Sequence, residues 1–157
     1  MIIHTDSFRY LYEVLEGNEY AALFKGLRVL DLGCNVGAFT LWILPFSERV
    51  WSVDADQKHI DNLGKTLMDN DIKNVTLIKD KTVDLFDLMS GHAIPVVDVL
   101  KIDVEGDEYK IFGRDTFPHF RVRNIIGEYH ADSPRELLTG FGYRYKELPD
   151  KHFIARL

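Results

Sequence analysis

Short apolar runs and amphipathic helical segments alternate along most of the chain, from residue 28 to residue 129. The runs predict buried strands, and the segments between them carry apolar residues at helical spacing, as at Ile60, Leu63 and Leu67. Strands that are joined by helices form right-handed crossovers, which place them parallel in one sheet with helices on both faces. The pattern therefore predicts a doubly wound, Rossmann-like α/β fold. The expected strands are 28–34, 50–54, 75–78, 96–103 and 124–129, and the expected helices include 38–44, 83–89 and 109–112.

The end of the chain departs from this alternation. A helix is expected near residues 134–138, and two extended segments, 143–148 and 152–156, follow it with Pro149 and Asp150 between them. Proline and aspartate favour a tight turn, so the two segments predict an antiparallel hairpin that closes the sheet.

The start of the chain predicts a further helix. Phe8, Leu11, Tyr12 and Leu15 form an apolar helical stripe that Gly17 could end. At 157 residues the chain has the length of one domain. We therefore expect a single domain, with residues 1–26 as a helical cap and residues 27–157 as the core.

A glycine-containing turn follows the first expected strand, where an open α/β sheet binds its ligand. Gly33 and Gly37 stand in this turn. A dinucleotide fingerprint needs glycine where Asn35 stands, which counts against an NAD-dependent oxidoreductase. A phosphate-binding loop needs glycine and lysine where Ala38 and Phe39 stand. The turn thus predicts close approach of backbone to a ligand that is neither a dinucleotide nor a nucleotide phosphate.

Asp54 ends the second expected strand, 23 residues after Asp31. A carboxylate at this place can accept hydrogen bonds from both hydroxyls of a ribose. The alternative is structural: Gly33 and Gly37 would only permit a tight turn, and Asp54 would only cap the next helix.

Three segments together resemble the FkbM family of S-adenosylmethionine-dependent methyltransferases. They are Asp-Leu-Gly-Cys-Asn-Val-Gly at 31–37, Ser-Val-Asp-Ala-Asp at 52–56, and Leu-Lys-Ile-Asp-Val-Glu-Gly-Asp-Glu at 100–108. The resemblance implies a class I methyltransferase domain with a mostly parallel seven-stranded sheet, and S-adenosylmethionine as the cofactor. It places Gly33 and its neighbours against the methionine part, Asp54 on the ribose and Asp80 by the adenine. The implied cofactor-binding residues are Asp31, Gly33, Cys34, Asn35, Gly37, Asp54, Ala55, Asp80 and Asp103.

Two departures from the family pattern affect these expectations. The family commonly has Glu-Pro at the ribose position, whereas this chain has Asp54 and Ala55, so Asp56 remains an alternative to Asp54. The N-terminal portion is short, so a lid or substrate-recognition segment of larger methyltransferases could come from a partner subunit, for instance in a homodimer.

The reacting centre is expected where the fourth and fifth strands end. Asp103 and Glu105 follow the fourth strand, while Glu128 and His130 stand two residues apart after the fifth and share one face if extended. Such a group could act as a general base or bind a divalent metal, and we favour His130 as the base and assign no metal. As alternatives, Asp103 and Glu105 could cap the following helix, Lys101 could neutralise one of them, and His130 could be a surface residue.

Composition narrows the function further. The net charge of −6 offers no footprint for nucleic acid, and the single cysteine, Cys34, fits a packing role better than a nucleophile. No apolar stretch of ~20 residues is present, so no membrane span and a cytoplasmic location are expected. The segment after the fourth strand also lacks the Asn/Asp-Pro-Pro-Tyr sequence typical of nucleobase amino methylation. We therefore expect O-methylation of a hydroxyl on a small molecule, sugar or lipid. The alternative is a non-catalytic cofactor-binding module that serves as a regulatory or scaffold subunit.

Overall fold

The computed structural model describes residues 26–81, 84–106, 108–112 and 122–157. The predicted N-terminal helix at residues 1–25 lies outside them. The chain elements are β1 (Leu27–Leu32), α2 (Ala38–Ile43), the 3-10 helix η2 (Leu44–Phe46), β2 (Ser47–Asp54), α3 (Gln57–Asp69), β3 (Val75–Lys79), α4 (Leu85–Gly91), β4 (Val99–Ile102), α5 (Glu108–Ile111), β5 (Asn124–Glu128), α6 (Arg135–Gly140), β6 (Arg144–Glu147) and β7 (His152–Arg156).

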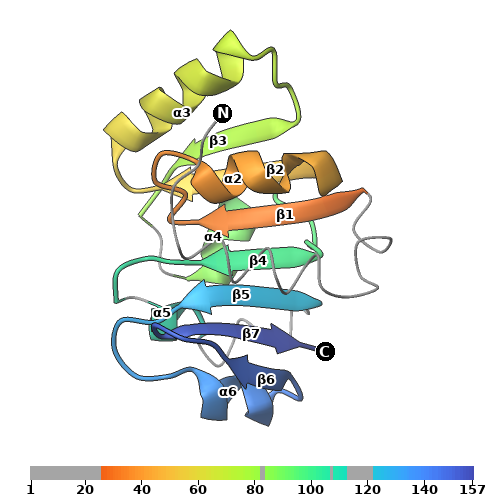
Figure 1. The fold of residues 1–157 in the computed structure, drawn as a ribbon, viewed down its shortest axis with the longest axis vertical. Coiled ribbons are helices and arrows are strands. Elements are labelled where there is room, and N and C mark those ends of the chain that lie inside the picture. The colour runs from red at the N-terminus through yellow and green to blue at the C-terminus, as the bar shows by residue number, and fades with distance from the viewer. Residues whose placement is uncertain (1–25, 82–83, 107, 113–121) are drawn as a thin grey trace.

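The strands form one seven-stranded sheet in the order β3-β2-β1-β4-β5-β7-β6. Strands β1 to β5 pair in parallel, and β7 pairs antiparallel with both β5 and β6. The predicted doubly wound fold and its closing hairpin are confirmed. The carboxyl ends of β1, β4 and β5 lie side by side, and β7 begins at this same edge (Figure 1).

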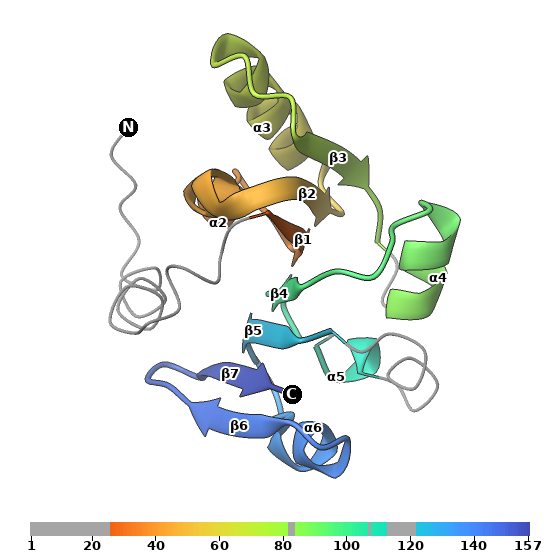
Figure 2. The same cartoon turned by 90° about the vertical axis from the view of Figure 1, so that its right-hand side faces the viewer.

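Helices cover both faces of the sheet, with α2 on one side and α4, α5 and α6 on the other (Figure 2). The larger core cluster packs α4, α5 and α6 against the sheet through residues such as Leu88, Ile111 and Leu138. On the opposite face, Phe39 and Ile43 of α2 pack against β1, β2, β4, β5 and β7. The apolar stripe of α3 predicted at residues 60, 63 and 67 forms a third cluster, which includes Cys34.

Several strand boundaries differ from the prediction. β4 spans Val99–Ile102 and is shorter than the predicted strand at 96–103, and two other differences have local physical reasons. β1 ends at Leu32 because Gly33 takes a left-handed backbone with φ +73°. β2 begins at Ser47, three residues early, because its polar first residues still pair with β1 although they carry no apolar signal. No helix in the described part of the chain is long and apolar enough to cross a lipid bilayer.

Candidate active site at the carboxyl edge of the sheet

The turn after β1 brings two strand ends into direct contact. A Cβ at Gly33 would lie 1.7 Å from the carbonyl oxygen of Asp103, which follows β4. The backbone N–H groups of Gly33 and Cys34 both donate to the carbonyl of Val53, at 3.0 Å each. Position 33 therefore needs glycine for its positive φ and for its close approach to Asp103.

Gly37 and Cys34 serve packing as well as the turn. Gly37 precedes α2 with φ +89°, and a Cβ there would lie 2.3 Å from a methyl group of Leu63 on α3. Cys34 is buried, and this burial raises the pKa of its thiol well above its ordinary range. The expectation that Cys34 is a packing residue agrees with this environment, although its backbone also lines one of the two pockets of the site.

Asp54, at the end of β2, organises the neighbouring loops. Its carboxylate accepts hydrogen bonds from the backbone N–H groups of Asn35 and Asp56, at 2.8 Å each, and lies 3.1 Å from Nδ1 of His59. Partial burial opposes ionisation, but these donors lower the pKa of Asp54 below its usual value. The alternative that Asp54 caps the next helix is wrong, because Asp56 caps α3 by accepting from the N–H of Lys58.

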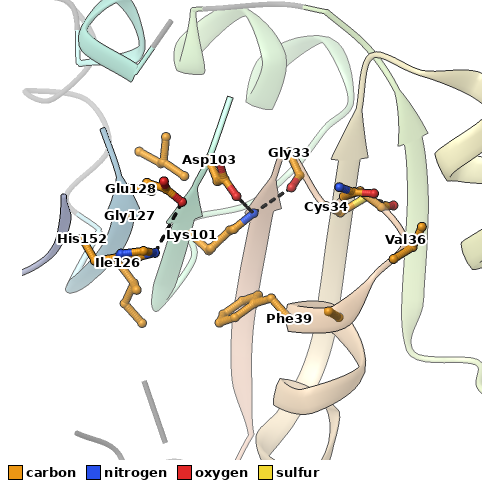
Figure 3. Close-up of a pocket in the computed structure, with 13 residues that line it drawn as sticks. Gly33, Cys34, Val36, Phe39, Lys101, Asp103, Ile126, Gly127, Glu128 and His152 are labelled. Atoms are coloured by element: carbon orange, nitrogen blue, oxygen red, sulfur yellow. Dashed lines mark hydrogen bonds and ion pairs between the residues drawn. The ribbon is translucent and has the colours of Figure 1, made fainter. Parts of the chain in front are cut away.

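A buried polar pair lies beneath the turn. Asp31 is fully buried, accepts a hydrogen bond from the Thr40 hydroxyl at 2.7 Å, and lies 3.4 Å from Nζ of Lys101. Burial raises the pKa of Asp31, although Lys101 opposes the shift. Lys101 also donates to the Gly33 carbonyl at 2.7 Å, so the pair fixes the turn from below (Figure 3).

Two adjoining pockets open at this edge, with volumes of about 260 and 220 Å³. The first, which we call the β2 pocket, is lined by Asp54, Ala55, His59 and Asp80 among others. The second, the β5 pocket, extends over β4 and β5 and is lined by the turn after β1, α2, β4, β5 and β7, with residues that include Phe39, Ile126, Glu128 and His152. The two pockets share Gly33, Asn35 and Asp103, so they meet at the turn.

Most of the predicted cofactor residues line these pockets, but two do not. Gly33, Cys34, Asn35, Asp54, Ala55, Asp80 and Asp103 line one or both pockets. Asp31 and Gly37 lie behind them and support the turn by the contacts described above. Asp80 also lies 2.7 Å from Nε2 of His92, which holds its carboxylate at the rim of the β2 pocket.

His130 lies near Glu105 and Glu128, as the strand positions predicted, and also near Glu108, which was not predicted. Its Nε2 atom is 3.5 Å from Glu105 and 3.6 Å from Glu128. Its Nδ1 atom is 2.8 Å from Oε1 of Glu108, whose side chain is only 3% exposed. Because an ionised carboxylate can only accept, Nδ1 carries a proton and Nε2 faces the strand ends.

The electrostatics of this group keep Glu108 ionised and favour the charged imidazole. Burial opposes the charge of Glu108, but the Gly106 N–H and the His130 ring lower its pKa. Partial burial likewise opposes protonation of His130, but Glu108, Glu105 and Glu128 outweigh it and raise the pKa of His130 above its usual value of 6.5.

Asp103, Glu105 and His130 could also hold a divalent cation. Each offers one ligand atom, and these atoms lie within 4.8 Å of one another. Carboxylate and imidazole are suitable ligands for several divalent metals. Two features compete with a metal, since the Lys101 ammonium lies 3.5 Å from Asp103 and the side chain of Glu105 is 86% exposed.

Three site residues were not predicted from the sequence. Glu108 ends the acidic segment at 100–108, but its role depends on the turn that aims it back at His130. His59 stands one helical turn into α3, five residues from its partner Asp54. His152 begins β7, and only the antiparallel register places it opposite Glu128.

The family model for the methyltransferase FkbM domain matches residues 55–149 of the chain. The chain belongs to the FkbM methyltransferase family. The match covers the His130 group, β6 and the lining of the β2 pocket from Ala55 onward, whereas Gly33 and Asp54 precede it, and it argues against the oxidoreductase alternative. No curated protein sequence matches the chain.

Solved structures share the fold of this FkbM-family chain at low sequence identity. A precorrin-6y C5,15-methyltransferase from Geobacter metallireducens superposes with a TM-score of 0.74 at 14% identity, over 99% of this chain and 90% of its own. A Clostridium thermocellum protein described as an rRNA methylase gives 0.64 at 16% identity, over 98% and 96%. Fibrillarin from Aeropyrum pernix, with natively bound S-adenosyl-L-methionine, gives 0.65 at 17% identity, over 94% and 73%. The acceptors named for these proteins differ, so the shared fold assigns no acceptor.

Proposed function

We propose that this FkbM-family chain binds S-adenosylmethionine in the β2 pocket and methylates a hydroxyl oxygen on a small molecule, sugar or lipid, with His130 as the general base. The observation that carries the proposal is the Glu108–His130 pair, which contacts one lining residue of each pocket, Glu105 of the β2 pocket and Glu128 of the β5 pocket. It presents a ring nitrogen, Nε2, whose partner nitrogen is fixed by a buried carboxylate at 2.8 Å.

The residues of the β2 pocket fit this cofactor. Gly33 and Asn35 of the turn line the pocket, so backbone of the turn can approach the methionine part. The ionised Asp54 faces the pocket and retains acceptor positions for ribose hydroxyls beyond its two backbone donors. Asp80 directly follows β3, the strand that pairs with β2, and lines the pocket near the place expected for adenine.

When bound, S-adenosylmethionine supplies a methyl group whose carbon bonds to the acceptor oxygen as its bond to sulfur breaks. The residues of this chain align the acceptor and take up the proton that its hydroxyl loses. Nε2 of His130 receives that proton, and the carboxylates of Glu105, Glu108 and Glu128 stabilise the imidazolium that forms.

An oxygen acceptor fits this group because a neutral alcohol needs a base before or during methyl transfer, and a positioned imidazole supplies one. The segment after β4 is Asp103-Val104-Glu105-Gly106, which provides carboxylates and no aromatic platform for a flipped nucleobase.

Calorimetry measures S-adenosylmethionine binding, and transfer of a labelled methyl group to a library of alcohols measures turnover. Together the two measurements separate the methyltransferase from the non-catalytic module. We expect Asp54→Ala to abolish S-adenosylmethionine binding, whereas Asp56→Ala, which removes only the cap of α3, should retain it. His130→Ala should keep cofactor affinity and lower turnover by about 100-fold or more, the usual contribution of a general base. Unchanged turnover in His130→Ala would exclude it as the base. Cofactor binding without turnover on any alcohol would favour the non-catalytic module.

A further inference from the structure

The β5 pocket differs in chemical character from the β2 pocket. Its walls are apolar, with Val36 from the turn, Ala38 and Phe39 from α2, and Ile126 from β5; Figure 3 shows Val36, Phe39 and Ile126. Polar groups gather at one end, where Lys101, Asp103, Glu128 and His152 lie at the strand ends. The pocket therefore combines an apolar chamber with a polar end beside the proposed reacting centre.

The position of this pocket separates it from the nucleoside. The residues expected to hold ribose and adenine, Asp54 and Asp80, line only the β2 pocket. Glu128 lines only the β5 pocket, and its carboxylate lies 3.6 Å from Nε2 of His130. A molecule in the β5 pocket would thus reach the base from the side opposite the nucleoside, as an acceptor must.

His152 gives the polar end a second imidazole. The antiparallel register pairs His152 with Glu128, and Nε2 of His152 lies 3.4 Å from the Glu128 carboxylate. Nδ1 of His152 lies 3.2 Å from the Pro149 carbonyl, which can only accept, so Nδ1 carries the proton. The Glu128 carboxylate thus lies between the Nε2 atoms of two histidines, and a hydroxyl placed there could donate its proton to Glu128 or to either Nε2 atom.

On this basis we propose that the β5 pocket is the acceptor site and selects a compact apolar alcohol, with Glu128 and His152 holding its hydroxyl. This inference rests on the proposed function and narrows its acceptor from small molecules, sugars and lipids to one class. A sugar would place several hydroxyls against Phe39, Ile126 and Val36, where they would lose hydrogen bonds to water without replacement. An aromatic or alicyclic body would bury its surface against the same side chains.

The experiment titrates the full chain, saturated with S-adenosylhomocysteine, with benzyl alcohol and separately with methyl α-glucopyranoside, followed by amide chemical shifts in NMR. We expect benzyl alcohol to bind and to shift the signals of Ile126 and Gly127, and the glucoside to leave them unchanged. Val36→Ser should weaken benzyl alcohol binding by roughly tenfold. Val96→Ser is the matched control, since Val96 is about as exposed as Val36 (48% and 53%) and lines neither pocket, and it should bind normally.

His152→Gln tests the polar end without emptying the apolar chamber. It should weaken benzyl alcohol binding at least threefold while leaving S-adenosylhomocysteine affinity unchanged, because His152 lines only the β5 pocket. Binding of the glucoside in preference to benzyl alcohol would overturn the acceptor class, and equal weakening by Val36→Ser and Val96→Ser would overturn the site. Failure of the chain to bind S-adenosylhomocysteine would instead reject the proposed function, and titration of the unliganded chain with benzyl alcohol would still test the pocket.

Discussion

Replacing Gly33 with alanine tests how tightly the cofactor turn is built. A Cβ at this position would lie 1.7 Å from the oxygen and 2.7 Å from the carbon of the Asp103 carbonyl. Backbone cannot rotate away as a flexible side chain can, so β1 and β4 would have to separate at their carboxyl ends. Gly142 provides the control, because it also has a positive φ, +90°, but a Cβ there would meet nothing within 4 Å.

The two substitutions should differ by the steric contribution alone. A left-handed backbone costs a non-glycine residue about 1–2 kcal/mol, and this is the whole effect expected for Gly142→Ala. Forcing an extra methyl group into packed surroundings typically costs about 1–3 kcal/mol more. We therefore expect Gly33→Ala to lower the free energy of unfolding by about 2–5 kcal/mol. Because the turn must open, the affinity of the Gly33→Ala variant for S-adenosylmethionine should also fall at least about tenfold, equivalent to about 1.4 kcal/mol.

Urea unfolding, followed by circular dichroism, gives the free energies, and calorimetry gives the cofactor affinities. Gly142→Ala should retain the affinity of the unmodified chain, since Gly142 lies in the turn before β6 and lines neither pocket. Equal losses of stability in the two variants would show that the contact between Gly33 and Asp103 is not tight. A Gly33→Ala variant with normal cofactor affinity would refute the argument that this turn shapes the site.

Three further predictions follow from the ionisable groups. Turnover should rise with pH as His130 loses its proton. Glu108→Gln should move the midpoint of that rise to lower pH and lower the plateau rate by roughly tenfold, because the amide still accepts from Nδ1 but carries no charge. An unchanged midpoint in the pH-rate profile would mean that Glu108 does not act through His130. The pKa values of Glu108 and Asp54 are lower in the folded chain than their unfolded values of 4.5 and 3.8, so the two ionised carboxylates stabilise the folded state above those pH values. The free energy of unfolding should therefore fall as the pH drops through the folded pKa values, and less steeply in Glu108→Gln. Parallel curves for the unmodified chain and Glu108→Gln in acid urea titrations would contradict this. The Cys34 thiol, buried and with a raised pKa, should resist iodoacetamide at pH 8 in the folded chain and react fully in urea, and rapid labelling of the folded chain in mass spectrometry would contradict its packing role.

Much of the fold could be predicted from the sequence because its signals are local. The stripe of Ile60, Leu63 and Leu67 and the apolar strands each report their own burial, and the alternation of the two fixes the parallel crossovers. The same locality explains the successful pairing of Glu128 with His130, since residues two apart on an extended chain share a face. Boundaries were less accurate where polar residues continue a strand, as in the first part of β2.

The residues that sequence reasoning missed act across long separations. Asp31 was expected against the cofactor, but the structure shows that it is fully buried beside Thr40 and Lys101. Its neighbours in sequence do not reveal this burial. Glu108 reaches His130 across 22 positions, and His152 meets Glu128 only through the hairpin register. Each of these contacts requires the pairing of strands to be known first.

The antiparallel hairpin has a consequence for the chemistry of this edge. Parallel strands bring their last residues to the ligand side of a sheet, so β1, β4 and β5 contribute their carboxyl ends and the turns that follow them. An antiparallel strand enters from the same edge, and β7 therefore brings its first residue, His152, to the side chain of Glu128. Glu108, at the start of α5, approaches the same group from the β4 exit and orients His130 after β5. The two histidines thus come from different sides of one carboxylate. The glycine turn and the acidic segment at 100–108 could not build the proposed proton-accepting group alone, because the group also needs the register of β5 and β7.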